Sequence, residues 1–123
     1  MAVSKSRNFQ DAFITTVVDP GFQVVRTYAI DPDSVLRFEI VATCRQQDGN
    51  NRGTFRRLGL FYRPATTPVS IQGQTWQSLE TIRSHSTMEI GFIMNSNSVS
   101  ITFRNPIATP CKWIAKVYLQ VLK

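Results

Sequence analysis

Hydrophobic and polar residues alternate along several stretches of this chain, which is the pattern of a β-strand with one buried and one solvent-facing side. The clearest stretch covers residues 35–45, where Leu36, Phe38 and Ile40 alternate with charged residues. Residues 98–104 and 112–121 show the same period, with apolar side chains at every second position. Each of these stretches predicts a strand that covers a hydrophobic core with one face.

Turn residues divide the rest of the chain into further short strands. Strands are expected at residues 10–18, 22–30, 35–45, 55–63, 69–72, 76–82, 88–94, 98–104 and 112–121. Asp19-Pro20-Gly21 favours a hairpin between the first two strands, and Asn95-Ser96-Asn97 predicts a second hairpin. Gly59 indicates a bulge, and Gly73 separates two of the short strands.

The pattern therefore predicts an all-β fold, namely a single antiparallel β-sandwich, jelly-roll-like, of about eight or nine strands. Composition agrees, because the β-branched residues that favour strands (11 Val, 10 Ile and 12 Thr) outnumber the strong helix formers Ala and Leu (7 and 6). Residues 1–9 are polar and basic without any period, so we expect an N-terminal arm there and one domain over residues 10–123. No stretch has the length and apolarity of a membrane span or a secretion signal.

Positive charge is the strongest indication of a binding partner. Fourteen Lys and Arg against eight Asp and Glu give a net charge of +6, which favours nucleic acid or an acidic protein surface. The same charge also fits a solvated surface that aids solubility, and composition does not choose between these readings.

Candidate catalytic or metal-binding chemistry is sparse in the sequence. His85 is the single histidine, and Cys44 and Cys111 lack metal-ligand spacing, so we expect two free, mostly buried thiols. No nucleophile elbow or glycine-rich phosphate loop occurs. A carboxylate pair brought together from distant strands stays open as an acid–base system. We expect a protein without enzymatic activity and without a cofactor.

Arginines gather around residues 45–63. Arg56 and Arg57 are adjacent in one expected strand and so point to opposite faces, which argues against a single nucleic-acid-binding face of arginines and aromatics. They fit either edge charges that limit aggregation or ion pairs with an acidic partner protein. The residues expected to contact such a partner are Lys5, Arg7, Arg52, Arg56, Arg57 and Arg63.

Three segments give the second half of the chain a recognisable pattern: RRLGLFYR (residues 56–63), VSIQGQTW (69–76) and SVSITFRNPIATPCKWIAKVYLQV (98–121). On these segments residues 56–121 resemble the small β-structured domains of bacteriophage virion proteins. The chain departs from that pattern at Asn105-Pro106 and Pro110-Cys111, where a turn rich in Gly, Ala and Thr is usual.

The resemblance implies a non-enzymatic structural protein of a tailed phage, located in the virion. A chain of this size looks like a capsid decoration (cement) protein, which binds the major capsid protein or other virion proteins, with a homotrimer favoured. A neck, baseplate or tail-associated component is the alternative. A basic nucleic-acid-binding β module is a further alternative, not favoured. A carbohydrate-binding jelly roll, in which Trp76, Trp113 and Tyr62 would stack on sugars, is the last.

Overall fold

The computed structural model describes residues 6–18, 21–65, 70–106 and 109–123, with backbone alone for residues 70–75. Eight strands make up the fold, which confirms the all-β prediction. They are β1 (Arg7–Val17), β2 (Gly21–Ala29), β3 (Ser34–Gln46), β4 (Arg52–Arg63), β5 (Ser70–Arg83), β6 (Glu89–Met94), β7 (Ser98–Asn105) and β8 (Cys111–Leu122). The described part of the chain contains no helix able to span a membrane.

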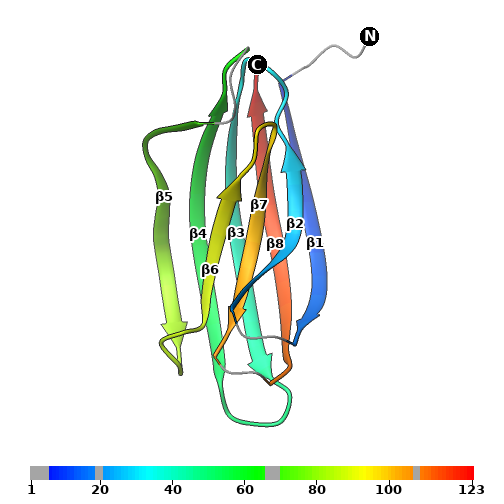
Figure 1. Ribbon diagram of the computed structural model, residues 1–123, viewed down its shortest axis with the longest axis vertical. Coiled ribbons are helices and arrows are strands. Elements are labelled where there is room, and N and C mark those ends of the chain that lie inside the picture. Colours follow the sequence, from blue (N-terminus) through cyan, green and yellow to red (C-terminus); the bar gives the residue numbers. More distant parts are fainter. Residues whose placement is uncertain (1–5, 19–20, 66–69, 107–108) are drawn as a thin grey trace.

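The strands form two antiparallel sheets packed face to face. The larger sheet has the order β1-β8-β3-β4-β5, and the smaller has the order β2-β7-β6. In Figure 1 the smaller sheet lies in front of the larger one. The order departs from an evenly divided eight-stranded jelly roll, because β4 and β5 continue beside β3 instead of joining the smaller sheet.

The hairpin expected between the first two strands is wrong. β1 pairs with β8 along its whole length, from Arg7 opposite Val121 to Val17 opposite Cys111, whereas β2 pairs with β7 in the other sheet. Alternation shows which side of a strand is buried but not which strand lies beside it. A hairpin turn and a connection that crosses between the two sheets therefore have the same sequence pattern. Gly21 begins β2 with a φ of 86°, and Asp19 and Pro20 lie outside the described residues.

The expected N-terminal arm over residues 1–9 is wrong for residues 7–9. β1 begins at Arg7, so residues 7–9 belong to the larger sheet and the body of the domain starts before residue 10. The polar composition of this segment hid the strand, because β1 lies at the sheet edge and its first four residues are exposed. Residues 1–5 lie outside the described residues.

Residues 70–83 form one strand where two short ones were expected. At the expected break between the two short strands, the register of β4 against β5 shifts, because Gly59 lies opposite Trp76 whereas Phe61 lies opposite Ile71. Gly59 also makes room for a neighbouring ring, since a Cβ there would lie 2.7 Å from a ring atom of Phe38. The irregularity predicted around Gly59 is therefore present, in the pairing of β4 with β5.

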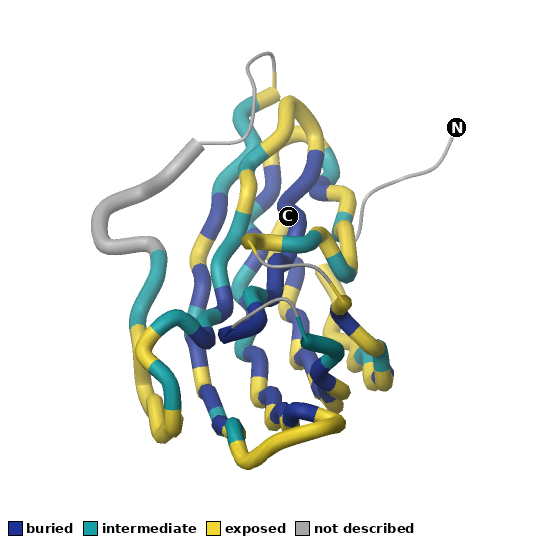
Figure 2. Tube along the Cα trace, turned by 60° about the horizontal axis from the view of Figure 1, so that its bottom comes forward, coloured by how far each residue is buried: buried dark blue, intermediate teal, exposed yellow. Residues whose placement is uncertain are grey.

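The hydrophobic core fills the space between the sheets, and Figure 2 shows buried and exposed residues alternating along the strands. The side chains predicted to face inward in β3, β7 and β8 are all buried. Trp113 of β8 stacks on Phe103 of β7 with ring centroids 4.4 Å apart, and Phe55 packs beside it. Cys44 and Cys111 are buried free thiols, and burial together with the nearby Cys111 raises the pKa of Cys44 to about 12.

Asn105, at the end of β7, supplies the polar contact inside this core. Its side-chain oxygen accepts a hydrogen bond from the Trp113 indole N–H at 3.1 Å, and its amide nitrogen donates to the carbonyl oxygens of Val17 and Thr109. The residue is 2% exposed. One side chain thus joins β7 to β1 and β8 across the two sheets, at the site where the sequence departs from the phage pattern.

Replacing Asn105 by alanine should lower the free energy of unfolding by about 2–4 kcal/mol, because the Trp113 N–H and the Val17 carbonyl would be left buried without partners. Urea denaturation measures the loss. Asn50→Ala, in the exposed β3–β4 loop, serves as the control and should change stability by less than about 0.5 kcal/mol. Equal stabilities for the two variants would contradict this role of Asn105.

Candidate functional site

The six cationic residues expected to contact a partner do not form one patch. Arg52 and Arg56 lie on the outer face of the larger sheet, Arg57 points into the sandwich, and Lys5 lies outside the described residues. Arg7 is 3.7 Å from Asp31, and Arg63 donates a hydrogen bond to the Ile30 carbonyl at 2.7 Å. The structure therefore brings only Arg52 and Arg56 onto a common face.

Arg57 has a structural role in place of the expected contact. Its side chain is 3% exposed, and its guanidinium donates to Glu89 Oε1 and to the Glu80 carbonyl, each at 2.6 Å. Arg83 adds a second ion pair at 2.9 Å to the other oxygen of Glu89. Since Glu89 begins β6, these contacts fasten the smaller sheet to β4 and β5 along one side of the sandwich.

Glu89 is ionised in this cluster at neutral pH. Burial acts to raise the pKa of its carboxyl, but the hydrogen bond from the Ile90 N–H and the two arginines outweigh burial and lower the pKa. The carboxylate is thus stabilised by folding. Its two guanidinium partners are committed to it and are not available for a partner protein.

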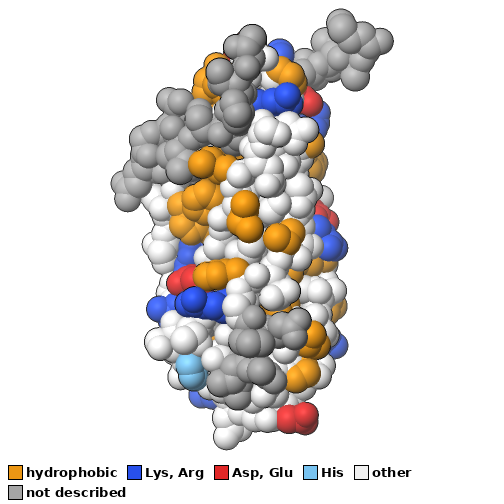
Figure 3. Space-filling model, in the orientation of Figure 1, with side chains coloured by type: hydrophobic (Ala, Val, Ile, Leu, Met, Phe, Trp, Pro, Cys, Tyr) orange, Lys and Arg blue, Asp and Glu red, His pale blue; other side chains and the backbone are white. Residues whose placement is uncertain are grey.

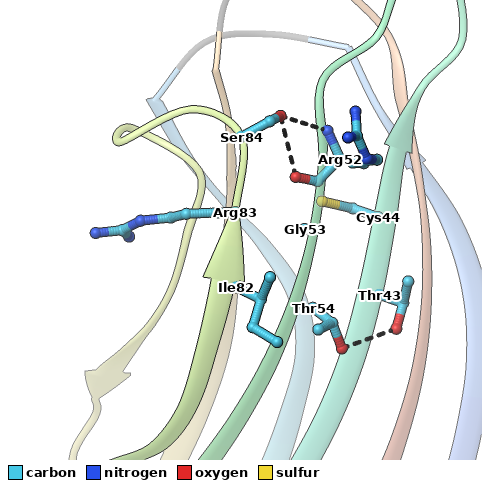
Figure 4. Close-up of a pocket in the computed structure, with 8 residues that line it drawn as sticks. All are labelled: Thr43, Cys44, Arg52, Gly53, Thr54, Ile82, Arg83 and Ser84. Carbon is cyan, nitrogen blue, oxygen red and sulfur yellow. Dashed lines mark hydrogen bonds between the residues drawn. The ribbon is translucent and has the colours of Figure 1, made fainter.

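The outer face of the larger sheet carries an exposed apolar row, which we call the isoleucine row. Cross-strand pairing places Ile14, Ile114, Thr43, Thr54 and Ile82 side by side across all five strands. The three isoleucines are 61%, 56% and 65% exposed in that order along the row. Figure 4 shows Ile82, Thr54 and Thr43 on adjacent strands, with Arg83 pointing away. Ile14 and Ile114 lie on neighbouring strands, and Thr43 and Thr54 lie between them and Ile82. Exposed aliphatic side chains gathered on one face are typical of an interaction surface.

A row of three cations, the cationic row, lies next to the isoleucine row. Arg45 of β3 stands opposite Lys112 of β8 on one side and opposite Arg52 of β4 on the other. All three residues are exposed. Among the described residues no carboxylate forms an ion pair with any of them, and the Arg52 guanidinium donates a hydrogen bond to the Asn50 carbonyl, at 2.8 Å. Like charges placed directly opposite on a sheet repel, so this row costs the isolated domain stability.

The outer face as a whole is basic. Its outward-facing charges are the cations Arg37, Arg45, Arg52, Arg56, Lys112 and Lys116 and the carboxylates Glu39 and Glu80, a net of +4. Arg56 donates to Glu39 through two nitrogens, at 3.1 and 2.7 Å. Most of the net charge of the chain, +6, therefore lies on one face.

The residues that sequence reasoning missed are Arg45 and Lys112. Alternation along the sequence puts each of them on the polar side of its strand, but they are 67 positions apart and only the pairing of β3 with β8 brings them together. Strand parity was the available signal. It identifies outward-facing residues and does not say which strands are neighbours.

The surface between the two rows is hollowed. Three adjoining hollows share Thr43, and one of them, of about 470 Å³, is lined by side chains of both rows, including Ile14, Arg45, Lys112 and Ile114. The opposite face, formed by the smaller sheet, has hydrophobic side chains in separate spots (Figure 3). The grooved outer face of the larger sheet is therefore the candidate functional site.

The described residues contain no group of three or more His, Cys, Asp or Glu placed to hold a metal ion. His85 lies in the turn between β5 and β6, where its Nδ1 accepts a hydrogen bond from the Thr87 N–H at 3.2 Å. Trp113 is fully buried, and Trp76 packs against Phe38 and Phe92, so neither ring lies free on the surface to stack on a sugar.

No protein-family model matches this chain, and no curated protein matches it. Its fold does occur in solved structures. The tailspike protein of Acinetobacter baumannii phage AM24 matches over 93% of this chain and 26% of its own, with a TM-score of 0.52 and 4% identity. This likeness establishes a shared fold. The chain spans about a quarter of the length of that tailspike.

Two further tailspikes match with lower scores. Tailspike protein gp49 of Acinetobacter baumannii bacteriophage Fri1, a capsular polysaccharide depolymerase, matches over 94% of this chain and 20% of its own, with a TM-score of 0.45 and 7% identity. The tailspike protein of Acinetobacter phage vB_ApiP_P1 matches over 88% and 22%, with a TM-score of 0.37 and 12% identity. These two scores are too low to establish a shared fold.

Replacing Glu89 by glutamine should lower the free energy of unfolding by about 2 kcal/mol at neutral pH, because the buried Arg57 would lose its counter-charge. The lowered pKa of Glu89 means that its contribution is complete above the ordinary glutamate pKa of about 4.3 and is lost as the pH falls below it. Urea denaturation should therefore show that the free energies of unfolding of the Glu89→Gln variant and of the unchanged protein converge as the pH is lowered. The control is Glu80→Gln, an exposed carboxylate opposite Arg56. Curves for Glu89→Gln and the unchanged protein that stay parallel would contradict the ion-pair account.

Proposed function

We propose that this chain is a non-enzymatic structural module of a bacteriophage virion, associated with the tail, that acts by binding other virion proteins. The observation that carries the proposal is the fold shared by nearly the whole chain with part of a phage tailspike. The resemblance of residues 56–121 to β-structured virion domains points the same way and rests on different grounds, namely sequence pattern.

The outer face of the larger sheet supports a contact function. Exposed aliphatic side chains on neighbouring strands, next to unpaired cations, suit a protein partner that covers the sheet. Three carboxylates of the described chain are paired with arginines within the domain: Asp11 with Arg26, Glu39 with Arg56 and Glu89 with Arg57. Depolymerase activity belongs to the Fri1 tailspike as a whole, and its absence from this chain stays a prediction.

Location in the tail is preferred here over capsid decoration, the first expectation from the sequence. Decoration rests on the size of the chain and the sequence resemblance, whereas the tail location also has the fold of a tailspike segment in its favour. A homotrimer and binding to the major capsid protein belong to the decoration reading. In the tail reading the partner is another tail protein.

Immunogold electron microscopy of phage particles, with antibodies raised against the purified chain, tests the location. We expect gold at the tail, because the fold matches a tail appendage. Label on the head would overturn the tail location in favour of capsid decoration, and particles that carry no label and no trace of the chain by mass spectrometry would overturn the virion function. Antibodies preabsorbed with the purified chain are the control for specificity.

A further inference from the structure

We propose that the outer face of the larger sheet binds an extended segment of a partner protein in which acidic and aliphatic residues alternate. Carboxylates of the segment would lie against Arg45, Arg52 and Lys112, and its aliphatic side chains against Ile14, Ile114 and Ile82. This inference names the partner chemistry for the contact function proposed above and rests on it.

No described carboxylate lies within ion-pairing distance of the cationic row. Arg45 stands between Lys112 and Arg52 on adjacent strands, and no described carboxylate pairs with them. By contrast Arg56, on the same face, is held by Glu39. Cations left unpaired and mutually repelling gain most from carboxylates supplied by another molecule, since arginine forms paired, charge-assisted hydrogen bonds with a carboxylate.

The isoleucine row specifies the second half of the ligand. Ile14, Ile114 and Ile82 expose more than half of their surface, and the hollow between Ile114 and Lys112 touches both rows. Aliphatic side chains covering these isoleucines would remove apolar surface from water. A purely acidic ligand would leave this row bare.

The spacing of the two rows fits a single extended strand. Adjacent strands lie about 4.8 Å apart, so the three cations span roughly 10 Å. Side chains on one side of an extended segment recur about every 6.8 Å, so two carboxylates fit over three cations. The rows are two residues apart along each strand, also about 6.8 Å. A segment lying between them would direct its alternate side chains to the two rows.

Two other occupants fit this face less well. Nucleic acid without sequence preference is held by aromatic side chains on which bases stack, and the aromatic residues of this face, Tyr62 and Tyr118, lie outside both rows. A second copy of the chain would bring one face with a net charge of +4 against another. An acidic protein segment satisfies both the charge and the aliphatic character.

Fluorescence anisotropy with a labelled octapeptide of alternating glutamate and valine tests the proposal. The peptide should bind the unchanged protein, and more weakly as salt rises. The Arg45→Gln/Lys112→Gln variant should weaken binding by about tenfold or more, since it removes two charge-assisted contacts. The matched control is Arg37→Gln/Lys123→Gln, which removes equal charge about 25 Å or more away along the strands and should change affinity by less than about twofold.

A second comparison tests the contact between the isoleucine row and the aliphatic residues of the peptide. Ile114→Thr keeps a β-branched residue at the same position and should weaken the glutamate–valine peptide severalfold, with circular dichroism confirming an unchanged fold. A glutamate–serine peptide should bind correspondingly less. Equal losses in the cationic-row variant and its control, equal binding of the two peptides, or tighter binding of duplex DNA than of the glutamate–valine peptide would each overturn the proposal.

The outcome is separable from that of the proposed function. Gold label on the tail together with no peptide binding would refute this partner chemistry and leave the virion function standing. Peptide binding together with particles that lack the chain would refute the virion function and leave an acidic-segment-binding domain.

Discussion

The packing of Trp113 between the sheets is the interaction on which the rest of this fold depends. Its indole stacks on Phe103, from the middle strand of the smaller sheet, and donates its N–H to Asn105 at the end of that strand. β8 holds both β1 and β3 on either side, so fixing Trp113 also fixes the register of the larger sheet. An asparagine buried in a core is stable only with its polar atoms paired, and the described structure leaves no buried side-chain nitrogen or oxygen without a partner.

Strand alternation then separates two uses of arginine. On the inward face, the buried Arg57 forms an ion pair with Glu89. Arg83 also pairs with Glu89, so the two arginines join the sheets along one side of the sandwich. On the opposite side Asp11 receives a hydrogen bond from Tyr28 and an ion pair from Arg26, which joins β1 to β2. Both of these sides are joined by ion pairs within the domain, whereas the cationic row on the outer face of the larger sheet has no carboxylate partner among the described residues. Adjacent residues such as Arg56 and Arg57 can therefore serve entirely different purposes.

Much of this architecture could be predicted from the sequence, because alternation reports burial directly. The inward sides of β3, β7 and β8, the β6–β7 hairpin and the two free thiols follow from local pattern. Pairing between distant strands does not. The crossing after β1 looks like a hairpin, and Arg45 and Lys112 become neighbours only through a register spanning most of the chain. Arg57 was predicted to contact a partner protein, but it is buried and pairs with Glu89. The sequence shows on which side of its strand Arg57 lies, but not that Glu89, on the other sheet, lies beside it.

Hydroxyl-radical footprinting tests most directly whether the outer face of the larger sheet is the contact surface that we propose. Side-chain oxidation would be compared between the free chain and the chain in assembled phage particles. We predict protection of Ile14, Ile82 and Ile114 in the particle, with Phe22 and Val24 on the smaller sheet, both exposed in the free chain, keeping their reactivity. Unchanged oxidation of the three isoleucines, with protection of Phe22 and Val24 instead, would contradict the account.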